Sequence, residues 1–297
     1  MVSHDAGGAE ILSSWVRSNP GEYSYVLAGP AVSIFQKKLG SIILVPLIDA
    51  LKNGNFVLTG TSWESDLELQ AISLARNLGI ESASFLDHWI NFEERFMSSG
   101  VLVLPDAIWV GDKEAERIAM ETFPETGILL KPNPYVMEFQ LEVEKFERNH
   151  PTPPHNKDME KVNVLFLGEN ISQNALKTHG DENYYGYEEK NSFLYFLDNL
   201  RAIDKLPLLI RVRAHPSEDP SKYFNAIPIH LLNLFEKDNS RQSLAADIEW
   251  SDVVVGMSSM ALYLASTVGK RTISCIPNPK VLISLPTAGI ERLSEII

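Results

Sequence analysis

The sequence has few of the residues that crosslink a chain or give it a basic surface. Its 297 residues include one cysteine, Cys275, so no disulfide can form within the chain and a reducing, cytoplasmic compartment is expected. Lysine and arginine number 26 against 39 aspartates and glutamates, which gives a net charge of −13. Because nucleic-acid backbones bind to basic surfaces, we expect no nucleic-acid partner.

Sequence patterns typical of several other protein classes are absent as well. No apolar run approaches the roughly 18 residues of a membrane span, so we expect no membrane-spanning helix. A peripheral association with a membrane is compatible with the sequence. Histidine and cysteine show no H-x-x-x-H or C-x-x-C spacing, so no metal site is expected. The chain has no G-x-G-x-x-G fingerprint, P-loop or G-x-S-x-G elbow. We therefore expect no bound cofactor.

Strand-like and helix-like segments alternate along most of the chain. Strands are expected at 25–28, 41–45, 55–60, 82–86, 107–110 and 127–130, then at 162–167, 208–212, 229–232, 253–255 and 272–276. Helices are expected at 64–78, 112–122, 188–203, 240–249 and 289–297. Such alternation indicates βαβ units and parallel sheets. The predicted fold class is α/β, with two Rossmann-like domains that face each other across a cleft.

A proline-rich break separates the two series of segments. Residues 148–161 contain three prolines and show no apolar period, which is typical of a stiff linker. We predict an N-terminal acceptor-side domain at 1–147 and a C-terminal donor domain at 162–297. Both ends look clipped, because the first strand is short and the chain stops inside an expected helix.

The most informative motif begins with the apolar strand at 253–255. Gly256 follows it, then Ser258 and Ser259, and then an expected helix. The amides of a first helical turn are unpaired and the helix dipole is positive there. A strand, a turn and a helix start in this order can therefore bind an anion such as the phosphate of a nucleotide-sugar donor. The alternative is that either serine is an ordinary helix cap.

A second motif lies upstream, where a strand ends in a His-Pro step. Pro216 restricts His215 to an extended conformation, which would aim the imidazole at a ligand. There the ring could donate to a phosphate or protonate a leaving group. Arg213 is a candidate phosphate partner, with an ordinary ion pair as the alternative. Two residues at the end of the preceding strand are counted with this donor-phosphate site: Gly168 and Glu169.

A loop with a glycine pair follows the first strand. Asp5 or His4 is a candidate general base for an acceptor hydroxyl, because catalytic groups are placed at the carboxyl ends of parallel strands. Gly7 and Gly8 would let the backbone approach a ligand closely. The alternative is that Asp5 caps the following helix and His4 packs in the interior.

Polar residues also follow two later strands of the first domain. Thr61 and Ser62 follow one strand, and Asp87 and His88 stand beside an aromatic residue after the next. A sugar stacks on rings and hydrogen-bonds to polar groups, so these residues are candidates for the acceptor side of the site. Ser62 is otherwise a helix cap.

The His-Pro step and the strand–turn–Ser-Ser–helix motif resemble those of the GT-B superfamily of glycosyltransferases. The nearest likeness is to its capsule-related branches: bacterial sialyl- and polysialyltransferases, Kdo transferases and glycerophosphate polymerases. The resemblance implies that His215 and the Ser258 and Ser259 pair bind the donor phosphate and that Asp5 is the base. Here Asp5 lies in a His-Asp-Ala-Gly-Gly stretch, where those enzymes carry an acidic pair.

The function implied is metal-independent transfer of a sugar from a CMP- or UDP-type donor to a hydroxyl of a surface glycan. Two other interpretations stay open. Non-hydrolysing UDP-N-acetylglucosamine 2-epimerases share the architecture but usually carry a glycine pair and an acidic residue after the strand-end serine. This chain has Met-Ser-Ser-Met-Ala at 257–261. The third interpretation is a non-catalytic GT-B-like protein that binds a nucleotide-sugar without turnover.

Overall fold

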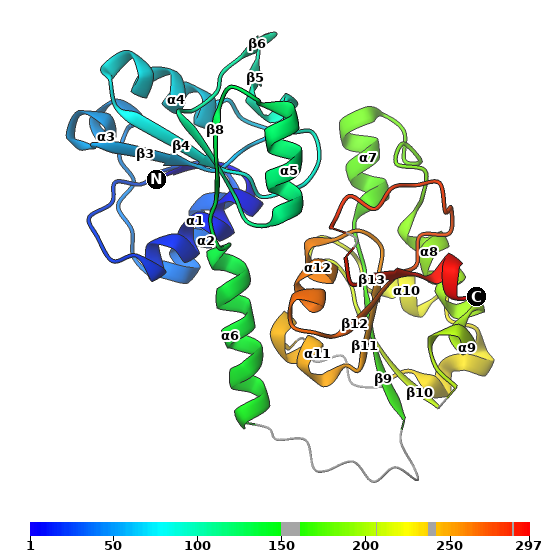
Figure 1. Cartoon of the computed structure of the whole chain (residues 1–297). Coiled ribbons are helices and arrows are strands. Elements are labelled where there is room, and N and C mark those ends of the chain that lie inside the picture. Colours follow the sequence, from blue (N-terminus) through cyan, green and yellow to red (C-terminus); the bar gives the residue numbers. More distant parts are fainter. Residues whose placement is uncertain (150–160, 206, 237–241, 287) are drawn as a thin grey trace. The chain divides into compact units, whose positions relative to one another are not determined.

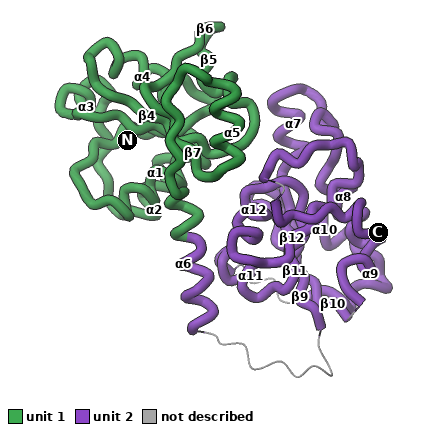
Figure 2. The backbone as a smooth tube through the Cα atoms, viewed as in Figure 1, with its two compact units in different colours: residues 1–138 green, residues 139–297 purple. Residues whose placement is uncertain are grey.

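The computed structural model describes residues 1–149, 161–205, 207–236, 242–286 and 288–297. The chain forms two compact units, 1–138 and 139–297 (Figures 1 and 2). The division falls within helix α6 (Pro134–Asn149). The predicted linker at 148–161 lies almost entirely outside the described residues, so it stays a prediction. Ser240, expected to cap the helix at 240–249, also lies outside them.

Unit 1 contains a six-stranded parallel sheet with the order β2-β1-β3-β4-β7-β8. Its strands are β1 (Val2–Ser3), β2 (Val26–Leu27), β3 (Phe56–Thr59), β4 (Glu81–Phe85), β7 (Ala107–Val110) and β8 (Gly127–Leu130). Its helices before α6 are α1 (Ala6–Ser18), α2 (Pro30–Leu39), α3 (Leu47–Asn53), α4 (Leu67–Leu78) and α5 (Lys113–Thr122). A 3-10 turn, η1 (Glu94–Phe96), leads into the antiparallel hairpin β5 (Met97–Ser98) and β6 (Val101–Leu102).

Alternating apolar side chains let helices cover both faces of this sheet. Leu58 packs with Ile11 of α1 and Phe35 of α2 in one buried cluster. Its neighbour Val57 packs with Ala71 of α4 in a second cluster. Successive strand residues point to opposite faces, so the two clusters lie on opposite sides of the sheet. A parallel sheet buried on both faces is the expected result.

Unit 2 contains a five-stranded parallel sheet with the order β10-β9-β11-β12-β13. Its strands are β9 (Val162–Leu167), β10 (Leu208–Arg213), β11 (Val253–Gly256), β12 (Arg271–Ser274) and β13 (Ile290–Arg292). The helical segments are α7 (Ile171–His179), α8 (Glu189–Asp198), α9 (Leu200–Ile203), α10 (Ser221–Phe224), η2 (Ile229–Leu234), α11 (Leu244–Trp250), α12 (Met260–Thr267) and α13 (Leu293–Ile296). Phe166 of β9 packs on Phe193 and Phe196 of α8, with ring centroids 4.7 and 5.3 Å away.

The α/β class with two Rossmann-like parallel sheets is confirmed, but several predicted elements are wrong. The segment 41–45 makes only one bridge, Leu44 to Tyr25. The expected strand at 229–232 is the 3-10 helix η2, since Ile229 is 87% exposed and gains nothing from a sheet. The segment at 170–187, for which no strand or helix is expected, contains α7, and the expected helix at 289–297 starts as β13.

Candidate active site

Both sheets reverse their strand order at one point. The reversal lies between β1 and β3 in unit 1 and between β9 and β11 in unit 2. Ligands of open parallel sheets bind at the carboxyl ends of the strands where the order reverses. The predicted site residues lie at or just after the ends of these strands or of the strands next to them, at the carboxyl edge of each sheet.

In unit 1, Asp5 and His4 form a hydrogen-bonded pair after β1. The His4 Nδ1 atom lies 2.7 Å from Asp5 Oδ1. Asp5 stands at the N-cap position of α1, but its side chain caps no amide of that helix. It accepts instead from the Ser62 hydroxyl at 2.7 Å and from the Trp63 amide at 2.8 Å. The carboxylate therefore ties the loop after β3 to the end of β1, and the helix-cap alternative does not hold.

The partner on Nδ1 determines the role of the other nitrogen of the His4 ring. A neutral ring whose Nδ1–H donates to Asp5 carries its lone pair on Nε2. That edge of the ring faces Gly29, where an added Cβ would lie 2.6 Å from Nε2. Gly29 also has a φ of +53°, which few other residues adopt. Asp5, His4 and a free Nε2 have the geometry of a histidine base oriented by a carboxylate.

Glu68 lies beneath this pair and was not indicated by the sequence. Its Oε1 accepts the His4 backbone amide at 2.7 Å, and the residue is 2% exposed. Burial raises the pKa of Glu68 to about 7, against the opposing effect of the His4 amide. An acidic residue in a first helical turn is common, so nothing in the pattern distinguished Glu68 from a surface residue.

Two predicted acceptor-side residues, Asp87 and Thr61, are joined by a residue that the sequence did not mark. Arg95 Nη1 donates to Asp87 Oδ1 and to Thr61 Oγ1, both at 2.8 Å. Arg95 is 5% exposed and lies in the irregular segment around η1, where no periodic pattern could reveal its burial. Burial, then the charge of Arg95, lowers the pKa of His88 to about 4, so the His88 ring is neutral at neutral pH.

The predicted glycine pair is required by contacts within the protein. A Cβ on Gly8 would lie 2.9 Å from the Cα of Gly60, and a Cβ on Gly7 would lie 1.8 Å from Asp87 Oδ2. The start of α1 therefore packs directly against the ends of β3 and β4. The closer approach of a ligand to these glycines stays a prediction.

In unit 2, the predicted anion site already holds a carboxylate. Glu169 Oε1 accepts the amides of Ser258 at 2.6 Å and Met257 at 3.2 Å. The hydroxyls of Ser259 and Tyr187 also hydrogen-bond to this carboxylate. Glu169 is 7% exposed, and burial raises its pKa to about 7. Its charge cannot attract a phosphate, so Glu169 organises the turn after β11.

The two predicted serines are held by different partners. Ser259 is the N-cap of α12, and its hydroxyl accepts the Leu262 amide at 3.4 Å. The Ser258 hydroxyl lies 2.8 Å from the Ser284 hydroxyl and accepts the Ser284 amide at 3.0 Å. The Leu262 amide is thus taken by the Ser259 cap. The first-turn amides of α12 that are left to bind an anion are those of Met260 and Ala261, which point towards the start of the helix.

The two predicted glycines of unit 2 differ in the space around them. A Cβ on Gly168 would lie 2.6 Å from the Tyr223 hydroxyl, so this glycine is required by packing. A Cβ on Gly256 would lie 3.4 Å from Leu167 Cβ, which is an ordinary contact. Gly256, unlike Gly168, can therefore be replaced by alanine without a clash, and this substitution can test whether a ligand approaches it.

Hydrogen bonds to His215 place the proton of its ring on Nε2. The Ser217 amide donates to Nδ1 at 3.3 Å, and the Ser217 hydroxyl lies 2.7 Å from the same atom. Asn170 donates to that hydroxyl at 3.0 Å. Burial lowers the pKa of His215, which favours the neutral ring, and because Nδ1 accepts the Ser217 amide the proton of that ring is on Nε2. The buried Glu218, missed in the sequence, accepts the His215 amide at 2.9 Å.

Arg213 is committed to an ion pair within unit 2. Its Nη1 lies 2.5 Å from Asp247 Oδ2 and donates to the Gln242 carbonyl at 2.9 Å. Asp247 also pairs with Arg211 at 2.8 Å. The alternative given in the sequence analysis, an ordinary ion pair, is therefore what the structure shows for Arg213. Arg213 is not part of the donor site proposed below.

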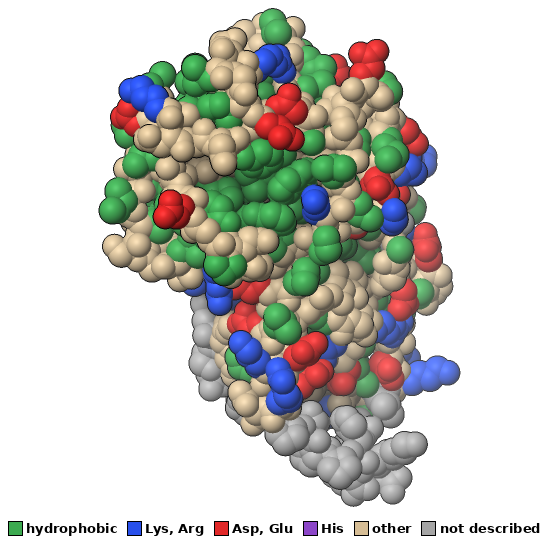
Figure 3. Space-filling view, turned by 60° about the vertical axis from the view of Figure 1, so that its left-hand side comes forward, with side chains coloured by type: hydrophobic (Ala, Val, Ile, Leu, Met, Phe, Trp, Pro, Cys, Tyr) green, Lys and Arg blue, Asp and Glu red, His purple; other side chains and the backbone are tan. Residues whose placement is uncertain are grey.

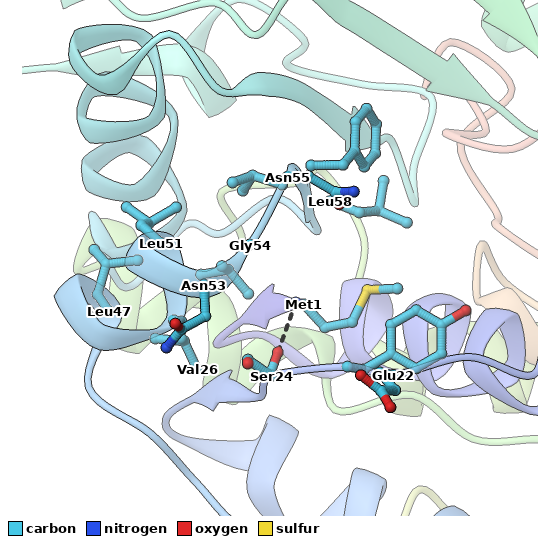
Figure 4. A pocket seen from close by; sticks show the side chains of 15 residues that line it. Met1, Glu22, Ser24, Val26, Leu47, Leu51, Asn53, Gly54, Asn55 and Leu58 are labelled. Atoms are coloured by element: carbon cyan, nitrogen blue, oxygen red, sulfur yellow. Dashed lines mark hydrogen bonds between the residues drawn. The ribbon is translucent and has the colours of Figure 1, made fainter.

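A cavity of about 630 Å³ lies at the opposite edge of the unit 1 sheet. Its lining includes Val2, Val26 and Phe56, which begin β1, β2 and β3. Figure 4 shows the amino group of Met1 donating to the carbonyl of Ser24, at 2.9 Å, beside the cavity. Hydrophobic side chains also gather on a face of unit 1 (Figure 3). No predicted site residue lines this cavity.

Two kinds of feature are absent from the described ranges. No group of three or more His, Cys, Asp or Glu side chains there could hold a metal ion. No helix there is long and apolar enough to cross a membrane. The expectation of a site without metal or cofactor stays a prediction.

Comparison with known proteins places the fold. No family model and no curated protein sequence matches the chain. The UDP-GlcNAc 2-epimerase of Methanocaldococcus jannaschii matches with a TM-score of 0.61 and 12% identity, over 99% of this chain and 90% of that one. The Neisseria meningitidis UDP-GlcNAc 2-epimerase bound to UDP-GlcNAc matches with a TM-score of 0.59 and 12% identity, over 100% and 88%.

MurG of Acinetobacter baumannii matches with a TM-score of 0.52 and 12% identity, over 99% of this chain and 85% of that one. At this level of identity the likeness shows the fold alone. The chain therefore has the GT-B fold, which glycosyltransferases and UDP-GlcNAc 2-epimerases share. This likeness does not distinguish the capsule-related branches of the superfamily from the others, so that part of the resemblance stays a prediction.

Proposed function

We propose that the chain is a cytosolic glycosyltransferase that moves a sugar from a nucleotide-activated donor, of CMP or UDP type, to a hydroxyl of a surface glycan. The observation that carries the proposal is the pair of His4 and Asp5 at the carboxyl end of β1. It supplies an oriented base at the position where sheets of this kind bind their ligands. The buried, single Cys275 agrees with a reducing compartment.

His4 is the base in this proposal, and Asp5 positions it. Asp5 already accepts from Ser62 and Trp63, so its carboxylate is engaged. The Nε2 atom of His4 takes the proton of the acceptor hydroxyl, and Asp5 stabilises the imidazolium that forms. The acceptor oxygen then attacks the anomeric carbon of the donor sugar. The bond from that carbon to the phosphate oxygen breaks, and the nucleotide leaves with the electron pair.

Unit 2 binds the donor in this proposal. The first-turn amides of α12 and the Nε2–H of His215 donate to the phosphate and offset its growing charge without a metal ion. Glu169 stays on the Met257 and Ser258 amides and holds the turn in shape. The neutral state of His215 suits donation of one hydrogen bond.

A transfer assay tests the proposal. CMP-sialic acid and UDP-GlcNAc are each incubated with oligosaccharide acceptors and the full chain, and products are followed by mass spectrometry. We expect a product heavier by one sugar, which His4→Ala and His215→Ala abolish. Undiminished transfer by both variants would overturn the assignment of the site.

Epimerisation is the second candidate, because two of the structural neighbours are UDP-GlcNAc 2-epimerases. The same assay separates the two reactions when the acceptor is left out. Formation of the C2 epimer from UDP-GlcNAc alone would favour the epimerase. Binding of a nucleotide-sugar with neither reaction would favour the non-catalytic protein.

A further inference from the structure

Trp63 is a large apolar residue that unit 1 holds open to solvent beside the His4 and Asp5 pair. It follows β3, and 51% of its surface is exposed. Its backbone amide donates to Asp5 Oδ2 at 2.8 Å. The hydroxyl of Ser62 accepts the amide of Ser65 at 3.1 Å, which fixes the turn that carries the indole. The backbone that carries the indole is therefore hydrogen-bonded directly to the carboxylate that orients His4.

One face of the indole is covered by a buried cation. The guanidinium of Arg95 lies 5.1 Å from the Trp63 ring centroid, and its side chain is 4% exposed. Arg95 is fixed in turn by Asp87 and Thr61. Because Arg95 is buried and covers one face, the exposed half of Trp63 is its other face and edge. A cation–π contact of this kind fixes the plane of the ring.

We propose that Trp63 is the platform on which the acceptor saccharide stacks. One face of a pyranose ring is lined by C–H groups, which pack on an indole, while its hydroxyls point outward to polar partners. His4 and Asp5 are such partners at the edge of this platform. An exposed indole that is already fixed binds a ring with little further loss of conformational freedom. The inference rests on the proposed function, since it names the substrate of the same site.

The charges around Trp63 favour a neutral ring over the nucleotide. Two carboxylates, Asp5 and Asp87, follow the carboxyl ends of the parallel strands β1 and β4, and the charge of Arg95 is balanced by Asp87. His88 is neutral because of its lowered pKa. A phosphate would therefore find no free cation among these named groups. A saccharide needs the hydrogen bonds and the apolar face that they provide.

Acrylamide quenching of tryptophan fluorescence tests this inference on the full chain without a donor. The probes are three uncharged saccharides: maltotetraose, chitotetraose and cellotetraose. We expect one of them to reduce quenching of the wild-type protein, because the chain's most exposed tryptophan becomes covered. Trp63→Phe should lose this protection, and Leu78→Ala, which removes an equally exposed apolar residue of unit 1, should keep it.

Steady-state kinetics give the second readout. Trp63→Ala should raise KM for the acceptor by about tenfold and leave KM for the donor unchanged, since a tenfold change corresponds to one moderate contact. Protection that survives in Trp63→Phe, no protection by any of the three probes, or protection by CMP or UDP alone would each overturn the inference.

These outcomes are distinguishable from failure of the proposed function. If a saccharide protects Trp63 but no sugar is transferred, stacking on Trp63 is supported and the transferase function is contradicted. If sugar is transferred and Trp63→Ala leaves the KM for the acceptor unchanged, the transferase function is supported and stacking on Trp63 is contradicted.

Discussion

The Nδ1 atom of His4 lies 2.7 Å from Asp5 Oδ1, and this contact fixes which nitrogen of the ring is free. A donor on Nδ1 leaves a lone pair on Nε2, as a base requires. His215 has the opposite arrangement, because its Nδ1 accepts from Ser217 and its Nε2 carries the proton. The two histidines are thus prepared for opposite roles, one taking a proton and one donating a hydrogen bond.

The base assignment predicts unequal effects of substitutions in the pair. His4→Ala removes the proton acceptor and should lower kcat by at least about a hundredfold, the range of general-base catalysis. Asp5→Asn keeps the size of the side chain but no longer stabilises the imidazolium, so it should also lower kcat strongly, with a smaller change in KM. Circular dichroism and thermal unfolding serve as controls for folding. Near wild-type kcat in His4→Ala would contradict the assignment.

The buried Glu68 predicts a pH dependence of stability. Its pKa is raised to about 7 in the folded chain, from an ordinary value of 4.5. The folded state then binds more protons than the unfolded state between these values, so the free energy of unfolding should fall as pH rises from about 4.5 to 7. Glu68→Gln removes this group. Denaturant unfolding at several pH values should give a flatter profile for the variant, and an identical profile would refute the account.

The buried pair of Arg95 and Asp87 predicts a large loss of stability on truncation. Arg95→Ala would leave Asp87 buried without its cation, which costs about 3–5 kcal/mol in comparable cases. Arg117→Ala is the matched control, because Arg117 pairs with Glu114 on the surface with its side chain 54% exposed. Urea unfolding should show a clear shift for Arg95→Ala and little change for Arg117→Ala. Equal, small effects would contradict the burial of the pair.

The two predicted site glycines of unit 2, Gly168 and Gly256, give a prediction that separates packing from binding. Gly168→Ala should destabilise the fold because its Cβ would meet Tyr223, whereas Gly256→Ala should not. If a donor phosphate lies against the start of α12, Gly256→Ala should weaken nucleotide binding while the melting temperature of the free protein stays unchanged. Isothermal titration with CMP and UDP checks this, and unchanged affinity would place the phosphate elsewhere.

The sequence predicted strands and their ends well, because buried parallel strands read as short apolar runs. β7, β8 and β9 were predicted with their observed bounds. Positions at strand ends could be predicted for the same reason, and the structure places His4 and Asp5 after β1 and His215 after β10. Their catalytic and binding roles stay predictions. Segments without a period could not be placed, and η2 and the segment at 41–45 were assigned to strands in error.

Side-chain partners that join distant segments left no local signal. Arg95, Glu68 and Glu218 are buried by groups far away in the chain or by turns, and the residues next to them in the sequence do not reveal this burial. Glu169 was predicted to bind a phosphate, yet its carboxylate accepts the turn amides itself. The pattern of strand, glycine and acid predicts where the strand order of a sheet reverses. It does not show whether the amides there bind a ligand phosphate or a carboxylate of the protein.

A thermal-shift screen of the full chain against CMP, CDP, UDP, GDP and their sugars, with and without EDTA, tests the central claim most directly. Ligands that bind the folded state raise its melting temperature by mass action. We predict a rise of several degrees (about 2–4 °C for each kcal/mol in a chain of this size) for one nucleotide class, unaffected by EDTA and lost in His215→Ala. No shift with any nucleotide, or one that EDTA removes, would contradict a metal-independent donor site in unit 2.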